Sequence, residues 1–283
     1  MFRSLFIVAT ILMMVPALAC GQRGDPCKVP LGEYYVALPA DGSSPRAAIV
    51  HFHGGGGDGF AVVEDRNIVG PMVDRNYVVL APHGQKRGSL GNGWTFRPDH
   101  VPGRDELAYL REIVADAVTR FNIDRNRVLV AGHSVGGSIT WYIACRAAPG
   151  EFAAYAPYSG GFWRPHPESC NGPVKMLHTH GWDDPVVPLE GRTFRRPQFT
   201  AMQGDIMEGL QMWRKMNGCD TQAPARMERG ETYWSRIWDK CAPGTALQFV
   251  LSPGGHDMTP FWPKLTMDWF EGQMKPLVSA SPK

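Results

Sequence analysis

The sequence predicts an α/β fold, in which helices cover both faces of a mostly parallel central sheet. Short apolar runs alternate along the chain with amphipathic segments of helical period, which is typical of a parallel sheet that is buried on both faces. Residues 20–283 have the length of one domain of this class. We therefore expect a single domain over that range.

Each element follows from its own pattern. Apolar runs predict strands at residues 33–38, 47–52, 77–81, 128–131, 153–158, 174–178 and 247–251. Helical periodicity predicts helices at 105–121, 137–144, 201–216 and 260–273, and a partly helical segment at 60–75. The clearest helix is 105–121, where one apolar stripe contains Leu107, Leu110, Ile113, Val114, Ala117 and Phe121.

One segment joins a strand, a tight turn and a helix. The strand at 128–131 runs into Gly132-His-Ser-Val-Gly136, which matches the pattern G-x-S-x-G. Glycine at both ends leaves room for neighbouring backbone at a strained turn. Such a turn raises the Ser134 hydroxyl above the edge of the sheet and directs the Val135 amide toward an oxyanion. The alternative is a glycine-rich turn with a helix-capping serine.

Candidate partners of Ser134 follow two later strands. Asp183 and Asp184 lie in a turn after the strand at 174–178, and His256 lies in a Gly-Gly loop after the strand at 247–251. The order serine, acid, histidine is that of a nucleophile, an orienting acid and a general base on a parallel sheet. Pro185 restricts Asp184 to extended conformations, which favours Asp184 over Asp183 as the orienting acid.

A glycine loop, His53 followed by four glycines, comes directly after the strand at 47–52. It fits a loop that supplies a backbone amide to an oxyanion. Gly54, Gly56 and Gly59 also satisfy the dinucleotide pattern G-x-G-x-x-G. That interpretation leaves Ser134 and its partners without a role.

Two His-x-His pairs, His51 with His53 and His178 with His180, each lie on one face of a strand. Such a pair can bind a metal; the alternative is a set of buried polar residues that bond to loop backbone. Glycines rather than an acid follow the first pair. We therefore expect no metal, and serine chemistry needs no organic cofactor.

Residues 1–19 have the pattern of a secretory signal. Arg3 precedes an apolar stretch at 5–15, and a small-x-small site ends at Ala19. We therefore expect a secreted or periplasmic protein without a membrane span. Cys20 follows directly and leaves lipid anchoring as an alternative, although Ala17 stands where lipid attachment normally requires a larger aliphatic residue.

The six cysteines predict disulfides in an exported chain. Six thiols allow many pairings, and sequence alone does not choose between them. Neighbours in the sequence suggest the pairs Cys145–Cys170 and Cys219–Cys241, which leaves Cys20–Cys27. The net charge of +2 and the lack of a Lys/Arg cluster give no support for nucleic-acid binding, and we expect a monomer.

A set of motifs recurs in a fixed order over residues 34–262. Its members are Phe52-His-Gly-Gly-Gly-Gly, Gly132-His-Ser-Val-Gly-Gly, His180-Gly-Trp-Asp-Asp-Pro-Val-Val-Pro188, Asn217-Gly-Cys219, Trp238 followed by Cys241, and Gly254-Gly-His256. The set resembles the secreted polyhydroxybutyrate depolymerase and feruloyl esterase group of α/β-hydrolases.

The resemblance implies an α/β-hydrolase fold and a serine esterase. It implies Ser134 as the nucleophile, Asp184 as the acid and His256 as the base. It also implies oxyanion-hole amides at Gly54, Gly55 and Val135. The chain departs from the family pattern beside these residues, at His133, Val135 and Asp257.

The ester substrate is left open, because a fold does not decide its substrate. A polyhydroxyalkanoate-type polyester and a feruloyl or acetyl ester of plant polysaccharide both fit the resemblance. Trp94, Trp163 and Trp182 fall in expected loops, where they form either an aromatic cleft for a polymeric or aryl ester or ordinary packing. A serine peptidase of the same fold and a catalytically silent binding protein are the alternatives.

Overall fold

The computed structural model describes residues 20–40, 45–96, 102–196 and 199–274. The expected signal at 1–19 lies outside these residues. A ten-stranded sheet forms the centre, in the order β1-β2-β4-β3-β7-β8-β10-β15-β14-β13. Its strands are β1 Cys27–Val29, β2 Gly32–Ala37, β3 Arg46–Phe52, β4 Val78–Pro82, β7 Ile123–His133, β8 Ala154–Tyr158, β10 Lys175–Gly181, β13 Arg226–Arg229, β14 Trp234–Trp238 and β15 Ala246–Ser252.

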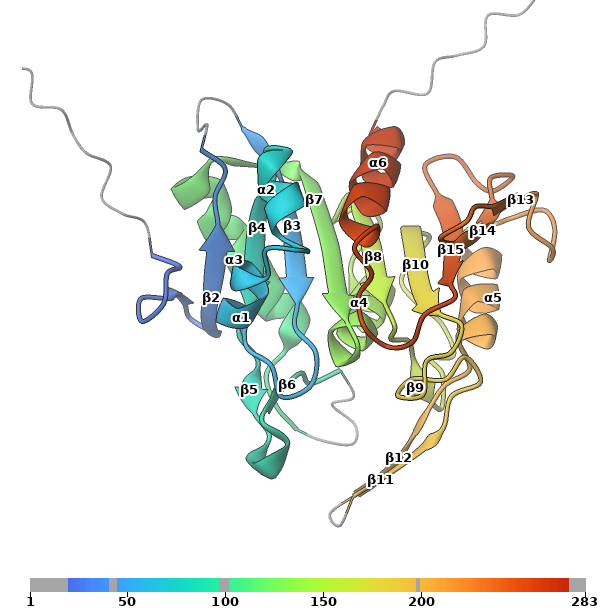
Figure 1. The fold of residues 1–283 in the computed structure, drawn as a ribbon, viewed down its shortest axis with the longest axis horizontal. Helices are drawn as coiled ribbons and strands as arrows, with labels where there is room; N and C mark the ends of the chain where they lie inside the picture. The colour runs from blue at the N-terminus through green and yellow to red at the C-terminus, as the bar shows by residue number, and fades with distance from the viewer. Residues whose placement is uncertain (1–19, 41–44, 97–101, 197–198, 275–283) are drawn as a thin grey trace, which may run out of the picture.

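The middle of this sheet is parallel and its margins are antiparallel. The strands from β4 through β3, β7, β8 and β10 to β15 pair in parallel, while β1–β2–β4 and β13–β14–β15 pair antiparallel. The parallel strands all point to the lower edge in Figure 1. Loops that follow these strands therefore meet at that edge.

Helices bury both faces of the sheet, as predicted. Along β3, Ala48, Val50 and Phe52 belong to one apolar cluster, while Ala47 and Ile49 belong to another. The first cluster contains residues of α3 Glu106–Phe121, α4 Val135–Arg146 and α5 Ile206–Met216, and the second contains residues of α2 Gly70–Asp74 and α6 Trp262–Met274. Because the two faces are both covered, the central strands are continuous apolar runs rather than alternating ones.

One predicted helix begins too early. Residues 201–203 belong to β12 Phe199–Gln203, which pairs with β11 Thr193–Arg196 and β9 Trp163–Arg164 in a separate three-stranded sheet. The helix α5 begins only after Asp205, whose carboxylate accepts a hydrogen bond of 2.9 Å from the amide of Glu208. This N-cap ends the strand hairpin and starts the helix at a defined residue.

The partly helical segment at 60–75 is two short helices. They are α1 Gly59–Glu64 and α2. Between them the Asp65 carboxylate accepts from the amides of Asn67 and Ile68, so the side chain competes with helical hydrogen bonding. A two-stranded sheet of β5 Gln85–Lys86 and β6 Asn92–Gly93, with the 3-10 turn Gly88–Leu90 between them, was not expected. It lies beyond the lower edge of the main sheet in Figure 1.

Three disulfides close loops in the pairs suggested by the sequence: Cys20–Cys27, Cys145–Cys170 and Cys219–Cys241. The sulfur of Cys20 is bonded to Cys27 and is therefore not free to carry a thioether-linked lipid.

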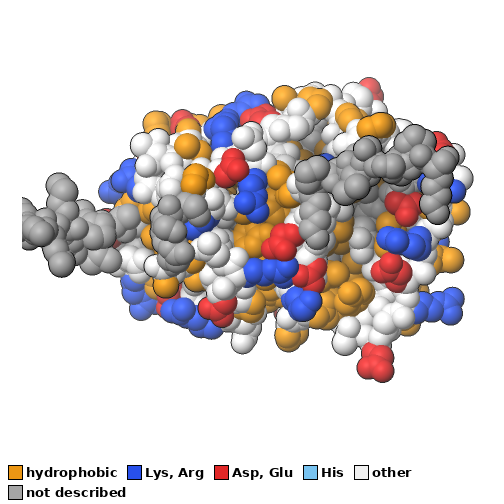
Figure 2. All heavy atoms as spheres, turned by 90° about the horizontal axis from the view of Figure 1, so that it is seen from above, with side chains coloured by type: hydrophobic (Ala, Val, Ile, Leu, Met, Phe, Trp, Pro, Cys, Tyr) orange, Lys and Arg blue, Asp and Glu red, His pale blue; other side chains and the backbone are white. Residues whose placement is uncertain are grey.

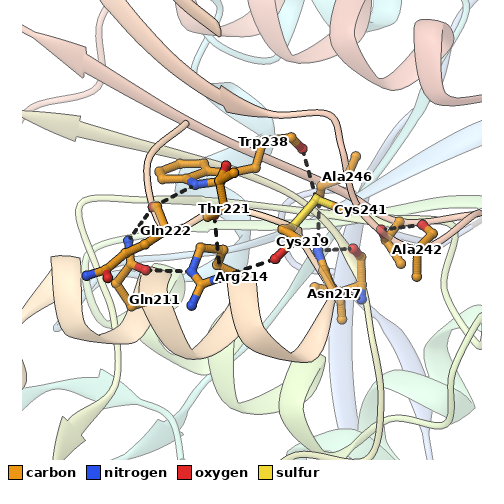
Figure 3. Close-up of a disulfide and its surroundings, with 12 residues drawn as sticks. Gln211, Arg214, Asn217, Cys219, Thr221, Gln222, Trp238, Cys241, Ala242 and Ala246 are labelled. Carbon is orange, nitrogen blue, oxygen red and sulfur yellow. Dashed lines mark hydrogen bonds between the residues drawn. A yellow bond between two sulfur atoms is a disulfide. The ribbon is translucent and has the colours of Figure 1, made fainter. Parts of the chain in front are cut away.

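The Cys219–Cys241 disulfide lies where α5 ends (Figure 3). Arg214 in the last turn of α5 donates to the carbonyl of Cys219 at 3.2 Å. The side chain of buried Asn217 exchanges two hydrogen bonds with the backbone of Val174, at 2.8 and 2.9 Å. These contacts fix the end of α5 to the chain that enters β10.

Charges of both signs are interspersed on the face opposite the carboxyl ends of the strands (Figure 2). This distribution agrees with a net charge of +2. Within the described ranges, none of the helices has the length and apolar character that crossing a membrane requires.

Candidate active site

Ser134 occupies a strained turn between β7 and α4. Its backbone has φ 59° and ψ −124°, a region that residues other than glycine rarely adopt. A Cβ on Gly132 would lie 2.3 Å from the carbonyl oxygen of Gly136, and one on Gly136 would lie 2.1 Å from that of Phe52. The turn therefore requires both glycines of the G-x-S-x-G pattern.

The glycine loop after β3 lies against this turn. A Cβ on Gly54 would be 3.5 Å from the Cβ of Ser134, and one on Gly55 would be 3.6 Å from Cγ2 of Val135. The Gly56 amide is occupied, because it donates to the carbonyl of Asn92 at 2.8 Å. Gly54 and Gly55 make no such backbone bond through their amides in the part of the chain that the structure describes.

His53 holds the glycine loop in place. The amide of Gly84 donates to His53 Nε2 at 3.0 Å, so the ring proton is on Nδ1 and is donated to the carbonyl of Gly54 at 2.7 Å. Burial lowers the pKa of His53 to about 4, which keeps the ring neutral. Trp94 adds a bond from its indole nitrogen to the carbonyl of His53 at 2.9 Å.

Asp184 is buried in the turn after β10. Its Oδ1 accepts from the amides of Val186 at 2.9 Å and Val187 at 2.8 Å, and its Oδ2 accepts from His256 Nδ1 at 2.8 Å. Burial by itself raises the pKa of this carboxyl, but the hydrogen bonds from His256 and the two amides outweigh it and lower the pKa to about 2. The neighbouring acid, Asp183, is exposed to solvent. The structure thus brings Asp184, rather than Asp183, to the histidine.

His256 also contacts the residue beside Ser134. The Nε2 of His133 lies 2.8 Å from the carbonyl oxygen of His256, and the two rings are 4.8 Å apart. Because a carbonyl can only accept, His133 Nε2 carries the proton. Burial lowers the pKa of His133, in agreement with a neutral ring. His256 therefore lies next to the turn that carries Ser134.

Backbone hydrogen bonds join the acid and base loops. The amide of Trp182 donates to the carbonyl of Ser252 at 2.7 Å, and the amide of Asp183 donates to that of Gly254 at 3.1 Å. The Ser134 hydroxyl makes no hydrogen bond to another described residue. Catalytic hydrogen bonds are often long in unliganded enzymes and shorten when substrate binds.

The three candidate tryptophans lie in different environments. Trp94 and Trp163 are buried, at 5% and 7% exposure, and both belong to the main apolar cluster. Packing, rather than an open aromatic cleft, is therefore their role here. Trp182 is 64% exposed and borders a cavity of about 500 Å³ that Met227 and Trp234 also line.

All four histidines of the His-x-His pairs are buried, but only three lie on strands: His53 follows the end of β3 and bonds to the glycine loop. Both ring nitrogens of His51 lack a hydrogen-bond partner among the described residues, while His178 and His180 bond to each other at 3.1 Å. No group of three or more His, Cys, Asp or Glu side chains suited to a metal occurs in the described ranges.

Two residues of the site were not predicted from the sequence. His133 and Tyr158 hold successive carbonyls of the base loop, since Tyr158 Oη donates to the carbonyl of Asp257 at 3.0 Å. The position of His133, directly before Ser134, was the available signal. Tyr158 ends a buried strand and carries no signal of its own.

Comparisons with known proteins found a family match and several similar esterases. The family described as Prolyl oligopeptidase family matches residues 65–162. Probable feruloyl esterase C from Aspergillus niger is 26% identical over 238 residues, which cover 81% of this chain and 77% of that protein. Feruloyl esterase C from Emericella nidulans is 27% identical over 241 residues, with the same two shares.

Solved structures share the fold. An acetyl xylan esterase from Aspergillus awamori has a TM-score of 0.65 at 19% identity, covering 84% of this chain and 93% of that one. A Bacillus cereus carboxylesterase has a TM-score of 0.56 at 15% identity, covering 87% and 96%.

The sheet order and the likeness to these solved structures define an α/β-hydrolase fold. Over most of its length the chain is similar to curated feruloyl esterases. The resemblance seen in the sequence motifs and the expectation of a hydrolase that acts on ester bonds are both confirmed.

Proposed function

We propose that Ser134, His256 and Asp184 form a catalytic triad. The 2.8 Å hydrogen bond between His256 Nδ1 and Asp184 Oδ2 is the observation that supports this proposal. His256 lies next to the strained turn that contains Ser134. An ionised Asp184 accepts the proton of Nδ1, so the lone pair of His256 is on Nε2, where a base must hold it to take the serine proton.

The reaction is acyl transfer in two steps. Ser134 Oγ attacks the ester carbonyl while His256 takes its proton, and the alcohol leaves with that proton. Water then attacks the acyl-enzyme by the same route and releases the acid. Asp184 stabilises the imidazolium that forms in each step, which its low pKa supports because the carboxylate stays ionised at neutral pH.

The oxyanion hole is formed by the amide of Val135 and an amide of the glycine loop. Val135 is the first residue of α4, where backbone N–H groups have no partner inside the helix. Gly54 and Gly55 lie against Ser134 and Val135. Removing one such donor costs roughly 10²–10³ in rate.

We propose a feruloyl ester, in which an aromatic acid is attached to a plant polysaccharide, as the substrate. The two curated relatives are named feruloyl esterases, and exposed Trp182 lies two residues before Asp184. The cavity beside it is bordered by Trp234 and Met227 as well as by charged side chains, and none of Ser134, Asp184 and His256 lines it. An acetyl ester is the next candidate and a polyhydroxybutyrate-type polyester the third.

We further propose that the chain is exported after removal of residues 1–19. Three disulfides support this proposal, because disulfides persist in oxidising compartments. The Cys20–Cys27 bond supports a free rather than lipid-anchored enzyme.

A peptidase is the second candidate, because the matched family is described as Prolyl oligopeptidase family. The match covers residues 65–162, which contain the Ser134 turn but neither Asp184 nor His256. The match therefore covers only the segment with the nucleophile, which esterases and peptidases of this fold share.

One substrate panel tests the proposal. Methyl ferulate, p-nitrophenyl acetate, polyhydroxybutyrate film and a prolyl p-nitroanilide are assayed with the wild type and with Ser134→Ala. We expect the wild type to hydrolyse methyl ferulate. Its turnover should fall by roughly 10⁴-fold or more in the folded Ser134→Ala variant. A fluorophosphonate should label wild-type Ser134, and its failure to label would support a silent binding protein. Preference for the anilide would replace the esterase by a peptidase, and unchanged activity of Ser134→Ala would remove the triad.

A matched variant tests the role of the exposed tryptophan. Trp182→Ala should raise KM for methyl ferulate several-fold while leaving p-nitrophenyl acetate unaffected, because only the aryl acid reaches the indole. Equal effects on both esters would remove Trp182 from the substrate site.

A further inference from the structure

The second His-x-His pair has no part in the proposed reaction, although it lies directly behind the acid. His178 and His180 lie on β10 and neither has any exposed surface. Buried polar side chains are costly unless they are hydrogen-bonded. Their partners therefore indicate what the pair does.

A single chain of hydrogen bonds runs through the pair. The indole nitrogen of buried Trp141 lies 3.2 Å from His178 Nδ1, His178 Nε2 lies 3.1 Å from His180 Nδ1, and His180 Nε2 lies 2.7 Å from the carbonyl oxygen of Val187. An indole can only donate and a carbonyl can only accept. Every proton in the chain is thereby fixed, and both histidines carry theirs on Nε2.

The chain ends at the proposed catalytic acid. His180 Nε2 is 3.5 Å from Asp184 Oδ2, the oxygen that also accepts from His256. Val187, whose carbonyl His180 holds, donates its amide to Asp184 Oδ1 at 2.8 Å. His180 thus contacts the acid directly and also fixes the residue that supplies one of its two amide donors.

Electrostatics in this region favour neutral rings. Burial lowers the pKa of His180. The hydrogen bond to the carbonyl of Val187 and the charges of Asp184 and Glu190 partly offset this effect, and the charge of His256 lowers the pKa further. Burial lowers the pKa of His178 as well, and Phe249 stacks on its ring at 5.8 Å. A neutral His180 donates its one N–H to the carbonyl of Val187, with Asp184 Oδ2 3.5 Å from the same nitrogen, and supplies no cation that would compete with His256.

We propose that His180 is a positioning residue for the acid of the triad, with His178 and Trp141 fixing its tautomer. This inference rests on the proposed function. His180 keeps Oδ2 of Asp184 directed at His256 Nδ1 and keeps the Val186–Val187 turn closed around Oδ1. The pair is therefore part of the esterase machinery and not a metal site.

A double-mutant cycle separates positioning from general stability. His180→Leu should lower kcat for p-nitrophenyl acetate by about tenfold or more, with KM changed less than about twofold, because a donor near a charged acceptor is lost. In an Asp184→Asn background the same change should cost less than about twofold, since the group through which His180 acts is already gone. Equal losses in both backgrounds would overturn the proposal.

Two further variants serve as conservative rescue and matched control. His180→Gln supplies an amide N–H toward Val187 and should recover most of the lost kcat. His51→Leu removes a histidine of the same burial that has no hydrogen bond among the described residues, and should leave kcat unchanged whatever it does to Tm. Loss of kcat in His51→Leu equal to that in His180→Leu would reduce the role of His180 to packing.

Spectroscopy keeps the inference testable if His180→Leu does not fold. In ¹⁵N-histidine-labelled wild type, His180 should be the neutral Nε2–H tautomer. The Nδ1–H tautomer would overturn the proposal. If Asp184 were not the catalytic acid, the Asp184→Asn variant alone would keep full activity. This result would contradict the proposed triad rather than the proposed role of His180.

Discussion

Replacing Asp184 by Asn removes one charge with almost no change in size, and the structure dictates how the amide must sit. The amides of Val186 and Val187 both donate to Oδ1, so the amide oxygen of Asn is required at that position. The NH₂ group then faces His256 Nδ1, where Oδ2 now lies at 2.8 Å. His256 is forced to accept at Nδ1 and to carry its proton on Nε2, so that it cannot take the proton of Ser134.

We therefore expect Asp184→Asn to lower kcat by roughly 10⁴, as the corresponding change does in chymotrypsin-type proteases. This is about 5.5 kcal/mol of lost transition-state stabilisation. Asp183→Asn is the matched control: Asp183 is exposed and joins the base loop through its backbone amide, so its loss should be less than about tenfold.

The assay is kcat for p-nitrophenyl acetate at pH 8, with circular dichroism to establish that each variant is folded. The reasoning fails if the two losses are reversed. The acid would then be Asp183, and the assignments of Ser134 and His256 would be unaffected.

Three further outcomes are expected. Asp184 has a folded-state pKa of about 2, below its ordinary 3.8, so its contribution to stability is present above about pH 4 and is lost as the pH falls toward 2. The unfolding free energies of wild type and Asp184→Asn should therefore converge as the pH falls from about 4 to 2. A difference that stays constant over this range would contradict the argument. Non-reducing peptide mapping should recover Cys145–Cys170 and Cys219–Cys241, each adding about 2–4 kcal/mol of stability, whereas free thiols there would refute the pairing. Activity should survive exhaustive EDTA treatment, and a loss that zinc restores would make the reaction metal-dependent.

The parallel centre of the sheet was predictable because its strands are buried on both faces. Runs such as residues 128–131 are apolar throughout and are followed by glycine turns, so their place in the sheet could be inferred. The margin strand β13 was missed because Arg226, Glu228 and Arg229 are charged and exposed. Only pairing with β14 makes this segment a strand.

The early start predicted for α5 has a local cause. Apolar Ala201 and Met202 continue the helical pattern backwards, but their pairing with β11 places them in a strand. Asp205, three residues before Glu208, was the capping signal that marks the true start.

The site residues were predictable where chemistry restricts the residue type. Glycine at 132 and 136, serine at 134 and an acid before Pro185 are each required by one geometry. The tryptophans were not predictable, because an indole in a loop serves packing and binding equally well, and only the fold shows that Trp94 is buried and Trp182 exposed. The tautomers of His178 and His180 depend on Trp141, which lies on α4 and far away in sequence.

The two margins of the sheet affect how the protein behaves at high concentration. An open sheet exposes unpaired backbone at its outermost strands, and such strands recruit other chains into aggregates. Here one outermost strand, β1, is three residues long and is tied back by the Cys20–Cys27 bond. The other, β13, is four residues long and presents three charged side chains. Both margins thus resist strand addition, which protects a chain that folds among many copies of itself.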